Sequence, residues 1–237
     1  MSGWCEYDPE TDTIYPMDES TCKAKERQTM DAINLVAFAR KVHENAVAHG
    51  WWEGKRDMAE VKALIHSEWT EALEEARAGR PMVWHMCPYT KGDYGKQAVH
   101  ENDDVHCEAC TPEMRKPEGI AVELIDGVIR ILDVMAQMFT GDDHEWWKVF
   151  EYAKAEACDR ARWDYQINVR AAKVSTIVNV LHDYTSDAVG AEVAENFGIA
   201  VGIAFEWIKA HGINPEEVMV QKNEYNLTRT YKHGKLF

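Results

Sequence analysis

The chain has 237 residues, 46% hydrophobic and 28% charged, a composition typical of a globular protein of one large or two ordinary domains. Its 26 basic and 41 acidic residues give a net charge of −15, which disfavours general affinity for nucleic acid or an anionic membrane surface. Six irregularly spaced cysteines are too few for a disulfide scaffold, so we expect reduced thiols, with one metal site as an option.

The first segment, residues 1–28, is polar and contains the turn-prone sequence YDPETD. It therefore predicts an irregular N-terminal extension. The segment lacks the basic and apolar regions of a signal peptide, and no apolar run in the chain approaches the ~20 residues of a membrane span. We expect a cytoplasmic protein with no membrane partner.

Apolar residues recur at helical spacing from Thr29 onward, and the first predicted helix closes at Gly50. The second runs from about Asp57 to Ala78 and stops at the sequence GRP. On a helical projection of this second helix, Glu68 falls inside the apolar arc and Glu71 lies at its edge. Because an unpaired buried carboxylate is costly, we expect a cation opposite these acids.

The segment 79–117 interrupts the helical pattern with glycine, proline, cysteine, histidine and charged residues, and predicts a long loop or insert. Tetrahedral Zn²⁺ would be held there by Cys87, Cys107, Cys110 and His106, with His85 or His100 as alternatives for the histidine. Only one C-x-x-C pair is present, which is half of a zinc signature. Free thiols are the alternative that the sequence leaves open.

Helix resumes over 118–139, and this helix is apolar around most of its circumference, which predicts a place in the middle of a bundle. Its narrow polar strip consists of Glu123, Asp126, Arg130 and Asp133. Four more helices are predicted, at about 143–165, 170–189, 191–211 and 214–228. No period-two alternation is long enough for a sheet, so the fold is predicted to be all-α.

Two pairs of segments indicate an internal repeat. HSEWTEA at 66–72 matches HDYTSDA at 182–188, and GIAVELID at 119–126 matches GIAVGIAF at 198–205. The two offsets, 116 and 79, differ by 37, which is close to the length of the insert. We therefore predict a helical bundle built from a duplicated unit, although chance similarity between amphipathic helices is the alternative.

The predicted first unit spans 29–165 and contains the insert, and the second spans 166–237 and ends in a basic tail. In the second copy the positions of the acids Glu68, Glu71, Glu123 and Asp126 are occupied by Tyr184, Asp187, Gly202 and Phe205. The acidic chemistry thus belongs to the first copy, and the second is predicted to be a degenerate packing partner.

Two acidic motifs point to a metal. Glu68 and Glu71 form E-x-x-E, and Glu123 and Asp126 form E-x-x-D. Residues three apart share a helix face, so two such helices side by side bring four carboxylates together, an all-oxygen set that favours Mg²⁺ or Mn²⁺. Solvated surface acids would be the simpler interpretation of either motif alone, but their apolar surroundings favour a metal site.

The C-terminal sequence QKNEYNLTRTYKHGKLF supplies bases in a strongly acidic chain. Lys222, Asn226 and Arg229 lie on one helical face, and Lys232 and His233 follow. Such a cluster is typical of a phosphate clamp. The alternative is a helix C-terminus whose bases complement the helix dipole.

The sequence resembles the MazG-like members of the all-α nucleoside triphosphate pyrophosphohydrolases, to which dimeric dUTPases are related. The resemblance rests on HENAVAHGWWE, ALIHSEWTEALEEARAGRP, KPEGIAVELIDGVIRILD and KNEYNLTRTYKHGK, and covers roughly 30–237 outside the insert. The chain departs from the family in one respect, because 79–117 lengthens the connection between the two acidic motifs.

The resemblance implies Mg²⁺-dependent hydrolysis of a nucleoside or deoxynucleoside triphosphate to the monophosphate and pyrophosphate, a role in nucleotide pool control. Its metal ligands would be Glu68, Glu71, Glu123 and Asp126. Either Glu68 or Glu71 would take the proton of the attacking water. Lys222, Arg229 and Lys232 would neutralise the departing pyrophosphate, with Asn226 and His233 beside them.

Related enzymes are dimers, so the second copy could supply within one chain what a partner subunit supplies elsewhere, as a monomeric pseudo-dimer or as a homodimer. Base recognition is predicted at Trp51 and Trp52, which could stack on a base, and at Asn45, which could hydrogen-bond it. Buried tryptophans at a helix corner are the alternative for this pair.

The alternatives to this enzyme belong to two other classes of protein. A carboxylate-bridged di-iron bundle would require E-x-x-H pairs, and neither acidic motif contains one. A catalytically inactive nucleotide-binding or interaction module of the same fold would use the same residues as the enzyme, so the sequence leaves this alternative open.

Overall fold

The computed structural model describes residues 5–8, 13–16, 33–54, 56–86, 99–100, 114–140, 145–163 and 171–230. The chain divides into two compact units, Met1–Asn34 and Leu35–Phe237. The described part of the first unit is an antiparallel pair of strands, β1 (Cys5–Asp8) and β2 (Thr13–Pro16). The prediction of irregular structure over 1–28 is wrong for these strands, because four residues are too few to display a period-two pattern.

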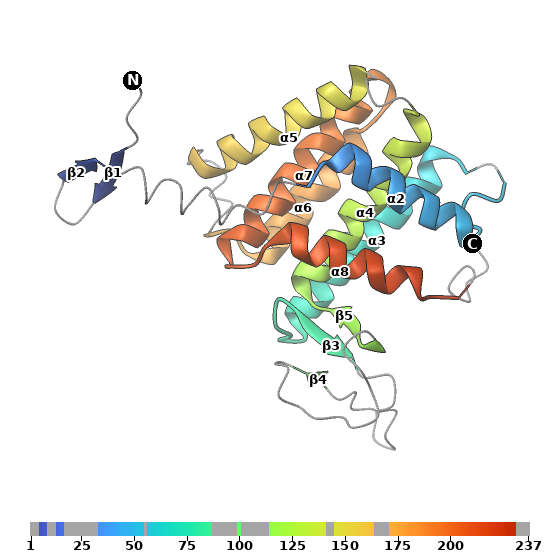
Figure 1. Cartoon of the computed structure of the whole chain (residues 1–237), viewed down its shortest axis with the longest axis horizontal. Coiled ribbons are helices and arrows are strands. Elements are labelled where there is room, and N and C mark those ends of the chain that lie inside the picture. The colour runs from blue at the N-terminus through green and yellow to red at the C-terminus, as the bar shows by residue number, and fades with distance from the viewer. Residues whose placement is uncertain are drawn as a thin grey trace. The chain divides into compact units, whose positions relative to one another are not determined.

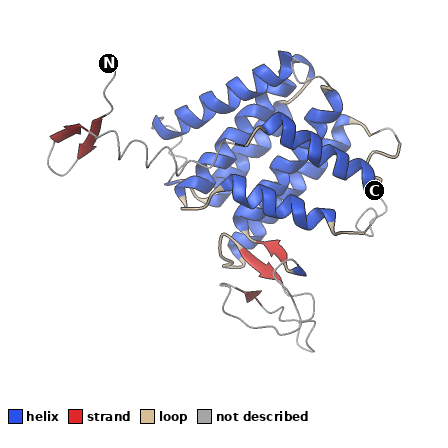
Figure 2. Ribbon diagram, viewed as in Figure 1, coloured by secondary structure: helices blue, strands red, loops and turns tan. Residues whose placement is uncertain are grey.

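The second unit is a bundle of helices (Figures 1 and 2). Its described residues form α2 (Leu35–Ala48), α3 (Met58–Arg77), α4 (Ile120–Met138), α5 (Glu145–Trp163), α6 (Val174–Asp187), α7 (Val193–Ala210) and α8 (Pro215–Leu227). Each lies inside a helix predicted from the sequence, and the short 3₁₀ turn η3 (Gly190–Glu192) leads into α7. The predicted all-α fold is confirmed. Among the described helices none is long and apolar enough to span a lipid bilayer.

Side-chain caps fix where the helices that carry functional residues begin. Asp57 caps α3, and its carboxylate accepts a hydrogen bond from the backbone N–H of Glu60 at 2.7 Å. Asn214 caps α8 in the same way through the N–H of Glu216, and Pro215 occupies the first helical position. These caps fix the first turn of each helix, and both helices contact α4.

The helix α4 occupies the centre of this unit, as its sequence predicted (Figure 1). Fourteen of its 19 residues are buried, and it contacts α2, α3, α7, α8 and β5. The half-exposed positions of α4 include Asp126, Arg130 and Asp133, so its polar strip is the part left open to a cleft.

A glycine lets α3 and α4 approach closely. A Cβ at Gly127 would lie only 2.3 Å from the ring of Trp69, which is fully buried. Gly127→Ala should therefore lower the free energy of unfolding by about 2 kcal/mol through overpacking, as measured by urea denaturation. Trp69→Leu should recover part of that loss in the double variant, and an additive pair of effects would contradict this contact as the cause.

The segment 79–117, predicted as a long loop or insert, contains the strands β3 (Trp84–Met86) and β4 (Val99–His100) and the start of β5 (Lys116–Glu118), in the antiparallel order β4-β3-β5. The prediction of a loop is wrong at these strands, which are too short to leave a sequence pattern. Trp84 donates its indole N–H to Glu75 at 2.7 Å, which ties the sheet to α3. Gly119, with φ of 116°, then turns the chain into α4, since a Cβ there would lie 2.7 Å from the Met82 carbonyl oxygen.

The contact between α3 and α6 joins side chains 116 positions apart. The Nδ1 atoms of His66 and His182 are 2.6 Å apart, and Trp69 donates its indole N–H to the Thr185 hydroxyl at 3.0 Å. On the other side of the bundle α5 packs closely on α7, where Cβ atoms at Gly198 and Gly202 would meet the carbonyl oxygens of Phe150 and Lys154 at 2.4 and 2.5 Å.

The pair of histidines between α3 and α6 makes stability depend on pH. Burial lowers the pKa of both imidazoles; His182 and Lys62 lower the pKa of His66 further, while Asp183 opposes the shift of His182. The unfolded chain therefore binds protons here at higher pH than the folded chain does. The neutral histidine pair therefore contributes fully to the free energy of unfolding above the ordinary histidine pKa of 6.5. That contribution is lost as the pH falls below this value.

Between pH 8 and pH 5, urea denaturation should show a larger loss of stability for the native chain than for the His66→Gln/His182→Gln variant. Equal losses in the two proteins would contradict this explanation.

Candidate functional site

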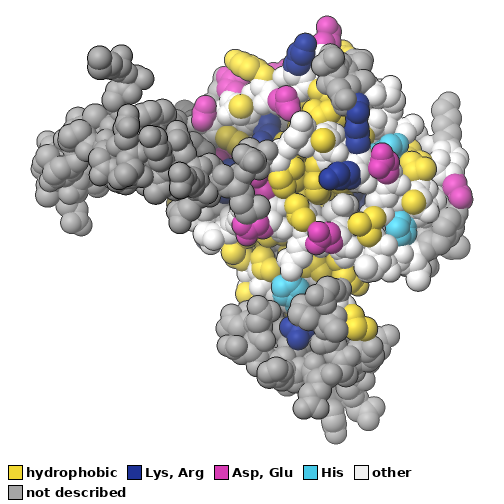
Figure 3. All heavy atoms as spheres, in the orientation of Figure 1, with side chains coloured by type: hydrophobic (Ala, Val, Ile, Leu, Met, Phe, Trp, Pro, Cys, Tyr) yellow, Lys and Arg dark blue, Asp and Glu magenta, His cyan; other side chains and the backbone are white. Residues whose placement is uncertain are grey.

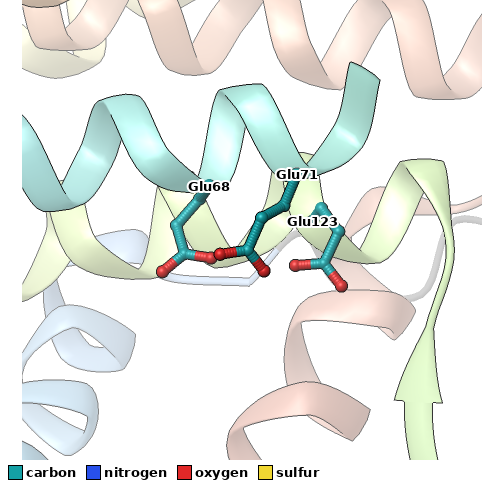
Figure 4. A group of neighbouring side chains, drawn as sticks. All are labelled: Glu68, Glu71 and Glu123. Carbon is teal, nitrogen blue, oxygen red and sulfur yellow. The ribbon is translucent and has the colours of Figure 1, made fainter. Parts of the chain in front are cut away.

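Three carboxylates from α3 and α4 converge. Ligand oxygens of Glu68, Glu71 and Glu123 all lie within 4.8 Å of one another. Figure 4 shows Glu68 and Glu71 one turn apart on α3, pointing to the same side as Glu123 of α4. Glu68 and Glu123 are 6% and 3% exposed, whereas Glu71 is exposed. Among the described residues this is the group of acids, histidines and cysteines placed to hold a metal ion.

The predicted fourth ligand, Asp126, lies outside this group and pairs with a buried lysine. Lys222 of α8 is 1% exposed, and its Nζ lies 2.8 Å from Asp126 Oδ2 and donates to the Pro117 carbonyl at 3.3 Å. Burial disfavours the ammonium charge, but Asp126 and Glu123 outweigh burial and hold the pKa of Lys222 above its ordinary value. Lys222 is therefore a permanent cation beside the acids.

A second cation, Arg130, contacts the cluster from α4. Its Nε donates to Glu68 Oε1 at 2.5 Å. Burial opposes the charge of the guanidinium, but Glu68 raises the pKa of Arg130 above its ordinary value. Burial also raises the pKa of Glu68, and Arg130 counters that shift only in part. The sequence-based expectation of a cation opposite Glu68 is met here by a side chain of the protein itself.

A further carboxylate comes from β5. Glu118 is 7% exposed, forms an ion pair with Lys116 and hydrogen-bonds Glu123. Burial, reinforced by Asp126 and Glu118, raises the pKa of Glu123 to about 9, although Lys222 opposes the shift. Although burial acts to raise the pKa of Glu118, the hydrogen bond with Glu123 and the nearby Lys116 hold that pKa below its ordinary value. Burial and the hydrogen bond with Glu118 thus favour the protonated form of Glu123, which donates to Glu118, and a metal bound there would displace that proton.

Apart from Glu118, these side chains line a cleft with a volume of about 150 Å³, between α2, α3, α4 and α8. Of the predicted residues, the cleft brings together Asn45, Trp51, Glu68, Glu71, Glu123, Asp126, Lys222, Asn226 and Arg229. Residues in and just after α2 and α8 thus line the same cleft as the acids that lie between them in sequence. On the face shown in Figure 3 acidic and basic side chains are interspersed rather than gathered into a broad field of one sign.

Several predicted residues fall elsewhere. Trp52 is not among the lining residues, and its indole N–H donates to both carboxylate oxygens of Asp133, at 2.9 and 3.1 Å. The predicted phosphate ligands Lys232 and His233 lie outside the described residues, and so do the predicted zinc ligands Cys87, His106, Cys107 and Cys110. The zinc site therefore stays a prediction.

The cleft also contains residues to which the sequence analysis gave no role. These are Val42, Ala46, His49, Arg56, Lys116, Ile129, Arg130, Asp133 and Asn223. The polar strip of the helix at 118–139 was a signal for two of them, Arg130 and Asp133. The sequence signal for Arg56 is its place shortly after the two tryptophans. In the structure its guanidinium lies over both rings, 5.2 Å from the centroid of Trp51 and 5.9 Å from that of Trp52.

Two amide oxygens in the cleft wall are buried without a hydrogen-bond partner, Oδ1 of Asn45 and Oδ1 of Asn226. His49 holds the elements that carry them together, because its ring nitrogens lie 2.8 Å from the carbonyl oxygens of Asn45 and Arg229. An unpaired buried acceptor is costly, so both oxygens are suited to accept hydrogen bonds from a ligand.

Comparison of the chain with models of known families, with curated proteins and with solved structures gives no match.

Proposed function

We propose that this chain is a Mg²⁺-dependent pyrophosphohydrolase that converts a nucleoside or deoxynucleoside triphosphate into the monophosphate and pyrophosphate. The observation that carries the proposal is the convergence of Glu68, Glu71 and Glu123 in one cleft with Lys222 and Arg229. Acids placed to hold a cation, beside bases placed to bind phosphate, are what such a substrate requires. The resemblance of the sequence to MazG-like enzymes agrees with this assignment.

The donor set fits Mg²⁺ or Mn²⁺. It consists of carboxylate oxygens without sulfur or imidazole, which suits a hard cation that keeps several waters. Glu68, Glu71 and Glu123 would hold the ion, which when bound supplies Lewis acidity and lowers the pKa of a coordinated water. We assign Asp126 to the orientation of Lys222, since that pair is formed in the structure.

In the proposed reaction a water oxygen forms a bond to phosphorus in the α,β-anhydride, and the bridging P–O bond breaks. The water proton passes to a carboxylate, for which we assign Glu71, because Glu71 is exposed in the cleft whereas Glu68 is buried. Lys222 and Arg229 stabilise the charge of the departing pyrophosphate.

The base and sugar are proposed to bind at the α2 side of the cleft. Trp51 offers an aromatic face, and the unpaired oxygens of Asn45 and Asn226 accept hydrogen bonds from N–H or O–H groups of the nucleoside. Trp52, by contrast, anchors the corner through Asp133.

The test is release of pyrophosphate from a panel of canonical and modified nucleoside and deoxynucleoside triphosphates, with Mg²⁺ and with a chelator. We expect turnover of at least one substrate that the chelator abolishes. Failure with every substrate would rule out the enzyme.

A second candidate is a nucleotide-binding module without turnover. The ion pairs of Glu68 with Arg130 and of Asp126 with Lys222 favour it, because they neutralise part of the acidic cluster without a metal. Calorimetric binding of a nucleotide that is recovered unchanged would support this candidate over hydrolysis.

We further propose that α2-α3-α4 and α5-α6-α7 are two copies of one three-helix unit. The contacts of His66 with His182 and of Trp69 with Thr185 each join equivalent positions of the repeat, as at a two-fold axis. This helix order supports a boundary after α4, within 139–144, rather than at 165. The chain would then be a monomer of 27.1 kDa, and a dimer mass by light scattering would contradict this.

A further inference from the structure

Arg130 contacts the acid cluster, which is the group formed by Glu68, Glu71 and Glu123. Its Nε donates to Glu68 Oε1 at 2.5 Å, and the guanidinium also interacts electrostatically with Asp126 and Asp133. Its side chain is 29% exposed and lines the cleft, so it has open space beside it. Arg130 therefore occupies the position of a counter-ion to the cluster.

Arg130 and a divalent cation compete for the same carboxylate. The oxygen of Glu68 that Arg130 occupies belongs to a residue in the group placed to hold a metal ion. A guanidinium and a dication at contact distance from one carboxylate repel each other strongly where burial limits screening. The contact between Arg130 and Glu68 thus opposes binding of the first ion.

A second anionic partner is available to Arg130 one turn along α4. The carboxylate of Asp133 is held from two directions, by His43 Nδ1 at 2.7 Å and by the Trp52 indole at 2.9 Å. This fixed carboxylate lines the same cleft. It keeps the guanidinium in the cleft, close to where phosphates would bind, once its bond to Glu68 is broken.

Lys222 offers a useful contrast. It is almost fully buried, it also donates to a backbone carbonyl, and its partner Asp126 lies outside the three-carboxylate group. Lys222 can keep its ion pair while the three glutamates hold a cation. Of these two cations, Arg130 is the one whose present contact must change.

We propose that Arg130 is an exchangeable counter-ion of the acid cluster. It neutralises Glu68 in the metal-free protein, leaves Glu68 when a divalent cation is bound, and then donates to a phosphate oxygen of the substrate. Metal and nucleotide each favour the released position of Arg130, so each strengthens binding of the other. The phosphate contact rests on the proposed function, whereas the competition for Glu68 does not.

The experiment measures Mn²⁺ binding to the full chain by calorimetry at pH 8, without nucleotide. Arg130→Met should bind Mn²⁺ about tenfold more tightly than the native chain, because the competing charge is gone. Arg77→Met is the matched control, since Arg77 pairs with Glu74 on the exposed side of α3, and it should leave the affinity unchanged. If Arg130 merely positioned Glu68, Arg130→Met would bind Mn²⁺ more weakly than the native chain.

The second measurement uses a nucleotide analogue with a non-hydrolysable α,β-methylene bridge, in saturating Mn²⁺. Arg130→Met should bind this analogue about tenfold more weakly, because a phosphate contact is lost. If Arg130→Met binds Mn²⁺ more tightly and the analogue more weakly than the native chain does, the full proposal is supported. If Arg130→Met binds Mn²⁺ more tightly but the native chain binds no analogue, the exchange at Glu68 is supported and the proposed function is contradicted.

Weaker or unchanged Mn²⁺ binding in Arg130→Met would overturn the proposal. Arg130→Gln serves as a second variant that keeps a hydrogen-bond donor without the charge, and circular dichroism checks that each variant is folded. The same increase in Mn²⁺ affinity is expected for Arg130→Gln, and its absence in a folded Arg130→Gln protein would also overturn the proposal.

Discussion

Glu123→Gln should reduce pyrophosphate release at least about a hundredfold at saturating Mg²⁺, because a metal ligand contributes several kcal/mol to the stabilisation of charge in the transition state. The substitution preserves shape. An amide at position 123 can still donate to Glu118, as the protonated Glu123 does. It also removes a buried ionisable group, so the stability of the variant should equal or exceed that of the native chain. Loss of activity in this variant would therefore not reflect unfolding.

Glu74→Gln is the matched control for this result. Glu74 lies on α3 with Glu68 and Glu71 but is exposed and pairs with Arg77. Its replacement should leave turnover unchanged. Turnover that survives Glu123→Gln, and likewise Glu68→Gln, would contradict the assignment of the metal site even if the chain hydrolyses nucleotides.

Lys222→Met should lower the free energy of unfolding by about 3 kcal/mol, since removal of the ammonium leaves the half-buried Asp126 without its partner and the buried Glu118 without one of its nearby cations. Lys222 is 1% exposed and pairs with Asp126 at 2.8 Å, with Glu118 and Glu123 close by. Methionine fills a similar volume, so loss of packing contributes little. Urea denaturation of the two proteins measures the difference.

The double variant Lys222→Met/Asp126→Asn separates charge from shape. It should recover a large part of the lost stability, because the unpaired carboxylate is also gone. Arg77→Met removes an exposed ion pair and should change stability by less than about 0.5 kcal/mol. A native-like stability of Lys222→Met alone would show that the buried ion pair does not support the fold.

The helices could be predicted because their signals are local. Asp57 and Gly50 are end signals that the sequence displays directly, and α3 begins at the residue after its cap. The central place of α4 followed from its nearly continuous apolar circumference, which only a helix surrounded by others can bury. The strands of the N-terminal hairpin and of the sheet β4-β3-β5 were missed, because two to four residues display no period.

The acidic half of the site was also predictable, because Glu68 stood inside an apolar arc. No sequence pattern showed which basic side chain pairs with which carboxylate on another helix. Arg130 and Lys222 reach Glu68 and Asp126 from 62 and 96 residues away in sequence, and only the packing of α4 against α3 and α8 sets these pairs. Trp52 was predicted to contact a base because tryptophan suits that role, and no sequence pattern showed that its N–H donates to Asp133.

The packing of α5 on α7 has an evolutionary consequence. In the proposed duplication Gly202 matches Glu123, and a Cβ there would already lie 2.5 Å from the Lys154 carbonyl oxygen. The Lys154 side chain lies over the ring of Phe205, the match of Asp126, with its Nζ 5.2 Å from the ring centroid. A carboxylate side chain at position 202 would require α5 and α7 to separate first. If the proposed duplication holds, a single substitution is therefore not enough to build a second acid pair at this position of the bundle.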